Sequence, residues 1–175
     1  MTVNFDDIKN FLTSRNPSAE IININIDDII FEERIKLRCY YCSKYNTKWT
    51  CPPRIPDLNF PQIIGEYKNA AIISLSIDFD KDSFEKARRD SSITLHRLIL
   101  ELESFLFNHN NVTYNSFIGG SCKLCKNGCD SEKCKNPGLA RIPLEATGMN
   151  IVETMKNYGV EIVFPPTKKI SEKQP

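Results

Sequence analysis

The sequence lacks the features of several common protein classes. No stretch approaches the ~20 consecutive apolar residues that a membrane-spanning helix needs. The first residues, MTVNFDDIKNFLTSR, contain no apolar run long enough for a secretory signal peptide, so we expect a cytoplasmic protein. A Walker-type phosphate loop, a GxGxxG turn, an HExxH helix and a Ser/His/Asp set are also missing. The sequence therefore gives no indication of a nucleotide-binding, metalloprotease or serine-hydrolase site.

The chain also lacks a strong charge of either sign. Its net charge of +1 gives no global attraction to nucleic acid or to a membrane surface, so such a partner would have to meet a local patch. A length of 175 residues and an apolar content of 41% suit one globular domain. We predict a single domain over residues 1–164 and a loose polar tail over residues 165–175.

What the chain does contain is cysteine in two tight groups. The patterns are C-x2-C-x8-C-P-P and C-x2-C-x3-C-x4-C, formed by Cys39, Cys42 and Cys51, and by Cys122, Cys125, Cys129 and Cys134. In a reducing cytoplasm such groups indicate metal or redox chemistry, whereas a complete set of disulfides would need an even number. Clustered thiolates are typical ligands of soft metal centres, so all seven are predicted metal ligands.

The second group can complete a metal site without help, because four thiolates form a full ligand set. Its short loops suit the wrapping of an iron–sulfur cluster. Gly119, Gly120 and Gly128 would let backbone amides approach the cluster sulfides. We favour one or two [4Fe–4S] clusters for this protein, although the spacing is equally compatible with a structural zinc site.

The first group has three cysteines, which leaves one metal position open or supplied from elsewhere in the chain. The possible fourth ligands are His96, His109, Asp57 and Glu145, and the sequence chooses none of them, although we expect His96 to be a packing residue. A rival interpretation treats the C-Y-Y-C pair as a dithiol redox site, which leaves Cys51 unexplained. The two groups could hold separate centres or share one.

Positive and aromatic residues surround the first group. Six cations and no acid lie between Arg34 and Arg54, interleaved with Tyr45, Trp49 and other rings. They could bind a phosphorylated cofactor or RNA. We favour compensation of the negative charge of a cluster, with Trp49 shielding it. Further along the chain, Arg141 and Glu145 are expected to form a surface ion pair, or else to point at a site beside the second group.

The hydrophobic periodicity predicts an α/β fold: a single layer-type domain with a mixed, partly parallel sheet, flanking helices and two cysteine-rich metal-binding loops. Residues 28–38 are ambiguous between strand and helix. Helices are expected over residues 4–15, 58–68, 82–107 and 144–158, and strands over residues 20–26, 70–77, 112–118 and 160–164. The strand over residues 70–77 is expected to be the most buried, because it is short, β-branched and almost uncharged.

The motifs resemble an uncharacterised family of "predicted metal-binding proteins", a domain of unknown function found mainly in anaerobic bacteria and archaea. The resemblance rests on C-x2-C-x2-Tyr45-x3-Trp49-x-C-P-P, on Gly119-Gly120-x-C-x-L-C-x3-C-x4-C-x2-P and on Arg141-x3-Glu145-A-x-G, and it covers roughly residues 30–160. It implies that the seven cysteines are the functional positions, with Tyr45, Trp49, Gly120, Pro137, Arg141 and Glu145 as companions. It implies no reaction.

These observations lead to three functional hypotheses. The first is an iron–sulfur protein that transfers electrons to a redox partner protein. The second is an enzyme whose three-cysteine cluster presents an open iron to a small anionic substrate. The third is a zinc-stabilised binding module, possible for RNA because of the basic aromatic segment that ends at Arg54.

Overall fold

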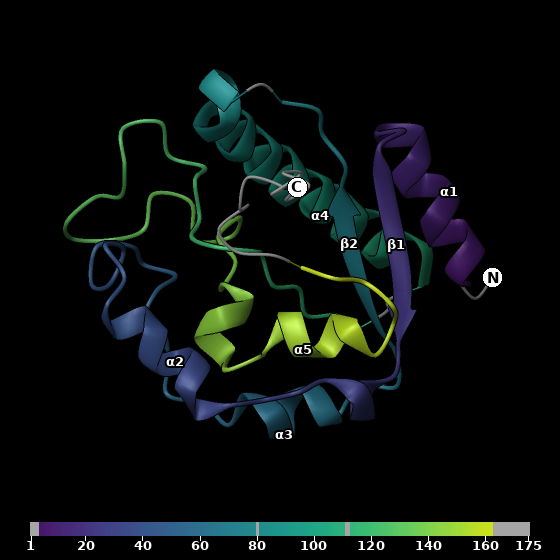
Figure 1. The fold of residues 1–175 in the computed structure, drawn as a ribbon, viewed down its shortest axis with the longest axis horizontal. Helices are drawn as coiled ribbons and strands as arrows, with labels where there is room; N and C mark the ends of the chain where they lie inside the picture. Colours follow the sequence, from purple (N-terminus) through teal and green to yellow (C-terminus); the bar gives the residue numbers. More distant parts are fainter. Residues whose placement is uncertain (1–3, 80, 111–112, 163–175) are drawn as a thin grey trace, which may run out of the picture.

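Helices surround a small two-stranded sheet in the computed structural model, which describes residues 4–79, 81–110 and 113–162 (Figure 1). The α-helices are α1 (Phe5–Arg15), α2 (Glu33–Tyr40), α3 (Phe60–Gly65), α4 (Phe84–Asn110) and α5 (Ile151–Lys156). The strands are β1 (Ala19–Ile24) and β2 (Ala70–Leu75), and the 3-10 helices are η1 (Ile26–Asp28), η2 (Lys81–Ser83) and η3 (Leu144–Thr147). Within the described ranges, every helix is too short or too polar to cross a membrane.

The sheet supplies apolar side chains to two separate cores. β1 and β2 pair antiparallel, with Ile21 opposite Ile73 and Ile22 opposite Ile72. Because neighbouring residues of a strand face opposite sides, these two pairs lie on opposite faces. The sheet is therefore half-buried on both faces.

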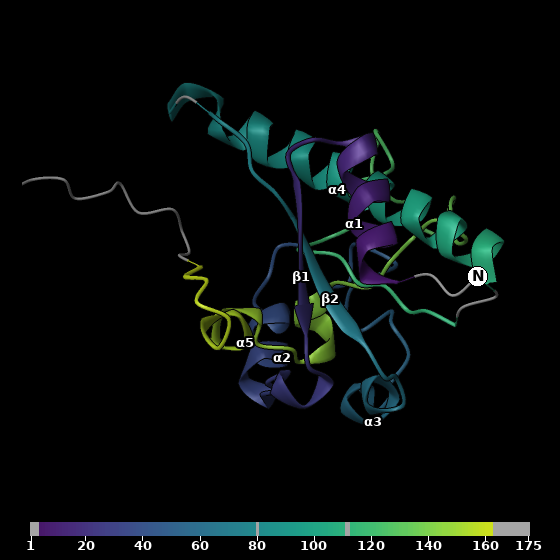
Figure 2. The same ribbon diagram turned by 90° about the vertical axis from the view of Figure 1, so that its right-hand side faces the viewer.

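The first core lies between α1, α4 and one face of the sheet. Its buried members are Leu12, Ala19, Leu98 and Leu102. The second core lies between the other face, α3 and the segment around η3, and its buried members are Ile24, Ile29, Ile64 and Met149. Figure 2 shows α1 and α4 beside one end of the sheet and α2, α3 and α5 near the other.

Several predicted elements are confirmed. The helices predicted over residues 4–15 and 82–107 are α1 and α4, and the strand predicted over residues 20–26 is β1. α1 begins at a capping box, in which the Asn4 side chain accepts a hydrogen bond from Asp7 N–H and the Asp7 carboxylate accepts one from Asn4 N–H. The ambiguous segment over residues 28–38 resolves into an extended stretch followed by α2.

Other elements are shorter than the sequence indicates. α3 spans Phe60–Gly65, inside the predicted helix over residues 58–68. The helix predicted over residues 144–158 is divided into η3 and α5, separated by Gly148 in a left-handed conformation. The strand predicted over residues 70–77 ends at Leu75. Ala71 and Ser74 are exposed, because each strand of a two-stranded sheet is an edge strand with a neighbour on one side only.

The partly parallel sheet is wrong, because the only described sheet is antiparallel. Of the strand predicted over residues 112–118, the described part forms no ladder and makes just an isolated parallel bridge between Ile118 and Pro143. Proline cannot donate a ladder hydrogen bond, so the bridge does not extend. The strand predicted over residues 160–164 is also wrong for its described residues, 160–162, which are irregular, and its remainder and the tail lie outside the described residues.

The first core should dominate the stability of the fold. Leu12 is 1% exposed between α1, the sheet and α4. We expect Leu12→Ala to lower the free energy of unfolding by about 2–5 kcal/mol, because it removes buried methyl groups and leaves a cavity. The matched control is Leu58→Ala at a side chain that is 45% exposed, which should change stability by about 0.5 kcal/mol or less. Equal losses in denaturant titrations of the two variants would contradict this description of the core.

Candidate metal centre

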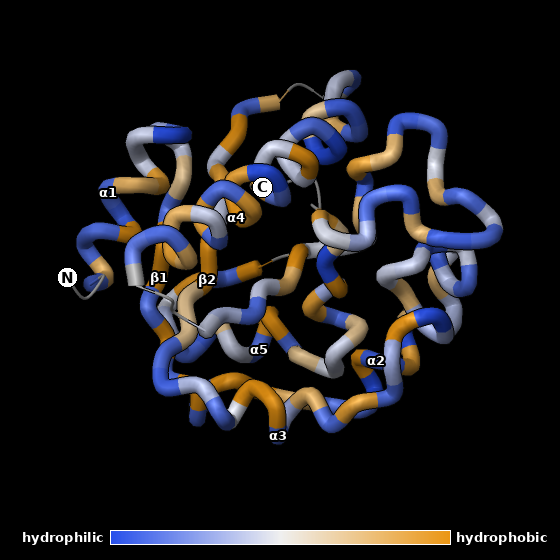
Figure 3. The backbone as a smooth tube through the Cα atoms, turned by 180° about the vertical axis from the view of Figure 1, so that it is seen from behind, coloured by the Kyte–Doolittle hydropathy of each residue, from blue (hydrophilic) through white to orange (hydrophobic). Residues whose placement is uncertain are grey.

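The two cysteine groups lie on loops on the same side of the fold (Figure 1). Both loops are mostly hydrophilic and project from the apolar sheet and helices (Figure 3). A direct contact joins them: the Trp49 indole Nε1–H donates a hydrogen bond of 2.8 Å to the carbonyl oxygen of Asp130. The first loop carries Trp49 and the second carries Asp130, so the groups lie close together, an arrangement that the sequence left open.

The first loop begins within α2 and continues as a series of turns. Cys39 is in the last turn of this helix, which ends at Tyr40. Successive turns follow, in which Tyr45 N–H bonds to the Cys42 carbonyl at 2.9 Å and Cys51 N–H bonds to the Lys48 carbonyl at 3.1 Å. Cys51 is buried, Cys39 is half-buried and Cys42 is exposed. This path wraps the three thiols into one region.

The second loop is closed at its base by the bridge between Ile118 and Pro143. Ile118 N–H donates to the Ile142 carbonyl at 3.1 Å, and Leu144 N–H donates to the Ile118 carbonyl at 2.8 Å. Between these fixed ends the chain is irregular and carries the four cysteines of the second group, all half-buried. Both ends of the loop are therefore held at one point.

Burial, together with nearby charges, raises the pKa values of Cys39, Cys51 and Cys122. Burial is the main cause that raises the pKa of Cys39, and it raises the pKa of Cys51 to about 11, with Cys39 and Cys42 adding to the effect. Burial likewise raises the pKa of Cys122, with smaller contributions from the other three thiols of its group. Without metal these thiols hold their protons, and a bound metal cation would have to displace them.

Hydrogen-bond donors are aimed at the sulfur atoms. Lys44 N–H points at Cys42 Sγ at 3.4 Å, and the Asn136 side-chain amide points at Cys125 Sγ at 3.3 Å. The Thr50 hydroxyl is buried without a hydrogen-bond partner of good geometry, but it lies close enough to Cys51 to favour its thiolate. Donors of this kind stabilise anionic sulfur and tune metal–sulfur centres.

The donor chemistry therefore fits a metal–sulfur centre in each loop. All seven thiols are free. Within the described part of the chain, no three Cys, His, Asp or Glu side chains converge on a point where a single ion could sit. In an iron–sulfur cluster the thiolates bind separate iron atoms around an inorganic core, so they surround the core and do not meet at one ion.

The aromatic and basic companions of the first group contact one another. The Arg54 guanidinium lies 4.4 Å from the centroid of the Trp49 ring, and Arg54 Nε–H donates to Asn46 Oδ1 at 3.0 Å. Tyr45 meets the edge of Tyr40, with ring centroids 5.2 Å apart. Arg54 and Trp49 therefore stiffen the first loop and its contact with the second.

The expected surface pair between Arg141 and Glu145 is wrong. Arg141 instead forms a bidentate ion pair with Glu103 on α4. Its Nε–H donates to Oε1 at 2.7 Å, and its Nη2–H donates to Oε2. Glu103 is 6% exposed and also accepts a hydrogen bond from the Ser116 hydroxyl. Its carboxylate raises the pKa of Arg141. This pair, in which Glu103 is buried and Arg141 partly exposed, anchors the end of the second loop to α4.

The sequence reasoning missed Glu103, Ser116, Thr50 and Asn136. One available signal was the place of Glu103 on α4. It lies four residues after Ile99 and next to Leu102, both of which are buried, and an acid on a buried helix face requires a partner. The other three carried no signal in spacing.

Gly120 and Glu145 are brought together. Gly120, which has a φ of +69°, begins the second loop, and its N–H donates to Glu145 Oε2 at 3.3 Å. Glu145 also interacts electrostatically with Cys39, where its charge raises the thiol pKa. One carboxylate thus lies between the two cysteine groups.

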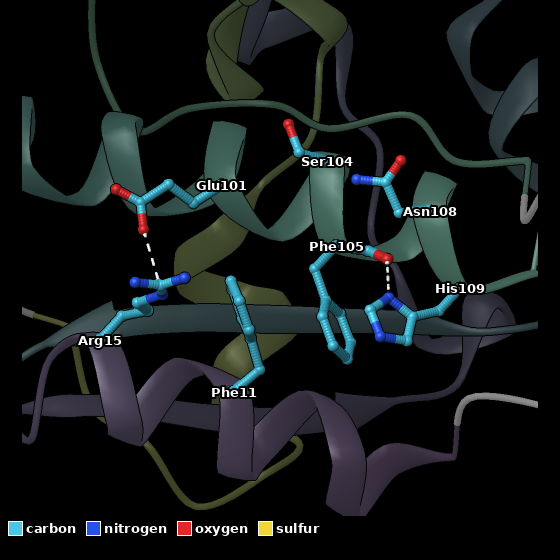
Figure 4. A pocket seen from close by; sticks show the side chains of 7 residues that line it. All are labelled: Phe11, Arg15, Glu101, Ser104, Phe105, Asn108 and His109. Atoms are coloured by element: carbon cyan, nitrogen blue, oxygen red, sulfur yellow. Dashed lines mark hydrogen bonds and ion pairs between the residues drawn. The ribbon is translucent and has the colours of Figure 1, made fainter.

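The two histidines make other contacts. His96 is 2% exposed on α4, and its Nε2 is 2.9 Å from the carbonyl oxygen of Leu139, as expected of a packing residue. His109 lines a groove between α1 and α4, where it stacks on Phe105 with ring centroids 4.2 Å apart (Figure 4). α1, which forms one wall of this groove, lies on the opposite side of the fold from the cysteine loops (Figure 3).

Loss of the anchor should be costly. We expect Glu103→Gln to lower the free energy of unfolding by about 2–4 kcal/mol, because Arg141 would keep its charge without its anionic partner. Glu101→Gln on the same helix is the matched control, since its ion pair with Arg15 is 3.6 Å long and exposed and should contribute less than about 1 kcal/mol. Similar effects of both variants in denaturant titrations would refute the anchoring role.

Comparison with known proteins supports metal binding by this chain. A family model described as "Predicted metal-binding protein (DUF2284)" matches residues 22–173. Searches of curated proteins and of solved structures gave no match. The matched segment contains both cysteine groups, and it confirms the resemblance that their spacing indicated. The chain therefore belongs to the DUF2284 family of predicted metal-binding proteins.

Proposed function

We propose that the protein is an iron–sulfur protein that exchanges electrons with a redox partner protein. Four cysteines of the second loop would hold one [4Fe–4S] cluster, and the three cysteines of the first loop would hold a second. One observation carries the proposal: two sets of free thiols, each coupled within itself, lie on adjoining loops joined by the bond from Trp49 to Asp130. When bound, such clusters supply one-electron redox chemistry.

The protein groups around the thiols suit this role. Donors from Lys44 N–H, Asn136 and Thr50 lie where they would stabilise the negative charge of ligating sulfur. The half-buried Lys123 of the second loop donates to Ser92 Oγ at 2.8 Å and is held beside Cys122, whose thiolate would favour its charge. These donors and the Lys123 charge would stabilise a cluster in both its reduced and its oxidised state, which differ in charge.

The first loop offers a surface for the partner. Cys42 is exposed, and the neighbouring rings of Tyr40 and Tyr41 are 61% and 78% exposed. Arg38 and Lys44 add positive charge beside these rings. We propose that an acidic redox protein docks here and reaches the first centre, in the reducing cytoplasm that free thiols require.

A second candidate function is an enzyme in which the first centre binds a small anionic substrate. It is favoured by the count of three thiols in this loop and by the exposure of Cys42. An open metal position next to solvent could act as a Lewis acid. In this case the charge of Arg38 and Lys44 would attract the substrate.

Metal analysis tests the iron–sulfur proposal. Protein purified without oxygen should contain about eight iron and eight acid-labile sulfide per chain, with visible absorption that bleaches on reduction. Zinc without sulfide would overturn the proposal and bring forward a zinc-stabilised module that binds RNA. Absence of all metal under these conditions would overturn both.

Single substitutions should divide the metal between the two loops. Cys125→Ser and Cys39→Ser should each remove about half of the iron and sulfide, because a hydroxyl is a poor substitute for a ligating thiolate. Ser43→Ala, at an exposed position of the first loop, is the control and should retain the full content. Loss of all iron from either cysteine variant alone would indicate one shared centre in place of two.

A further inference from the structure

The segment from Pro143 to Asn150 connects the base of the second loop to α2, the helix that carries Cys39. At its start, Leu144 N–H bonds to the Ile118 carbonyl at 2.8 Å, which closes the base of the second loop. At its end, the Gly148 carbonyl accepts a bond of 2.9 Å from Glu32 N–H, at the N-terminus of α2. η3, between these two attachments, packs directly against α2.

Packing in this segment is tight enough to place its residues firmly. Gly148 has a φ of +89°, and a Cβ atom there would lie 2.9 Å from Lys36 Cε on α2. Asn150 N–H donates to the Ile30 carbonyl at 2.7 Å, and its side chain bonds to Glu32. α2 ends at Tyr40, one residue after the first ligand of the three-cysteine group. The side chains of η3 are therefore held beside the helix that carries Cys39.

Glu145 is the acid at this junction. Its Oε2 accepts one long bond, 3.3 Å, from Gly120 N–H. Among the described residues it forms no ion pair, although it is half-buried. Its negative charge contributes to the raised pKa of Cys39. Its charge also interacts electrostatically with Lys123 of the second loop, so a metal cation in the first centre would add to the partial stabilisation that Gly120 and Lys123 give it.

The structure separates Glu145 from the other possible fourth ligands. His96 is directed at the Leu139 carbonyl, and His109 is in the groove between α1 and α4 (Figure 4). Asp57 is exposed, whereas Cys51, the nearest ligand in sequence, is buried. Of the four, Glu145 is the one on a segment that bonds both to the base of the second loop and to the N-terminus of α2.

We propose that Glu145 supplies the fourth protein ligand of the Cys39/Cys42/Cys51 centre. This inference rests on the proposed iron–sulfur function and holds for either use of that centre. A carboxylate is a harder and weaker ligand for iron than a thiolate. The position it occupies is therefore exchangeable, and an incoming thiolate can displace it. Through its bond with Gly120, the same side chain ties the first centre to the second loop.

The test isolates the first centre and then changes Glu145. In a Cys125→Ser/Cys134→Ser background, which disables the second group, we expect about four iron per chain after anaerobic assembly with iron and sulfide. Glu145→Gln keeps an oxygen that can accept the Gly120 N–H bond but removes the anionic ligand. Glu33→Gln is the control, because it removes an exposed carboxylate from α2 that pairs with Lys36 at 2.8 Å.

Three measurements report on ligation: the visible and EPR spectra, the midpoint potential, and spectral titration with 2-mercaptoethanol. We expect Glu145→Gln to shift the spectra at a lower thiol concentration than its parent needs. Glu145→Cys should abolish the thiol response and lower the midpoint potential, because it supplies a fourth thiolate. Glu33→Gln should match the parent in all three.

The outcomes separate this inference from the proposed function. Identical spectra, potentials and thiol responses in all variants would overturn the role of Glu145 while leaving the iron–sulfur function intact. Failure of the background variant to assemble iron, when the full chain does so, would overturn the inference together with the first-loop cluster, and would leave the cluster of the second loop as proposed. A full chain that assembles no iron and sulfide would overturn both. Circular dichroism of each variant checks that the fold is retained.

Discussion

The ion pair between Glu103 and Arg141 connects the hydrophobic framework of this protein to its chemistry. A carboxylate that is 6% exposed is stable in its charged form only with a strong partner, and here the partner, Arg141, lies at the end of the second loop. Glu103 belongs to α4, whose Leu98 and Leu102 pack in the first core. The end of this irregular, cysteine-rich loop is therefore fixed to a long helix. The four cysteines before Arg141 are held in one loop although that loop has no regular secondary structure.

The segment from Pro143 to Asn150 extends this framework to the first group. It is bonded to the base of the second loop at one end and to the N-terminus of α2 at the other. α2 carries Cys39, and the turns after it carry Cys42 and Cys51. Burial raises the pKa values of Cys39 and Cys51, so these two thiols keep their protons in the metal-free chain. A metal cation bound by them would displace those protons and stabilise the thiolates.

Regular elements followed from local patterns where one face was strongly apolar. α1 and α4 have that periodicity, and β1 has alternating residues, so their approximate positions could be predicted. The strand expected over residues 112–118 failed because its polar residues serve side-chain contacts: Asn115 bonds to Tyr67, and Ser116 to Glu103. The prediction of a partly parallel sheet also failed, because pairing depends on which segments meet in space and not on the composition of any one of them.

For the site, cysteine spacing predicted the metal-binding character that the family model supports, and the role of the seven thiols as ligands stays a prediction. Tertiary structure determined which residues support them. It paired Arg141 with Glu103 instead of Glu145, and it placed Glu145 between the two groups. These contacts join segments far apart in the chain and depend on the packing of α2, η3 and α4, which no spacing rule encodes. Residue types and their spacing are therefore readable from the sequence, whereas the contacts that position those residues are determined by the fold.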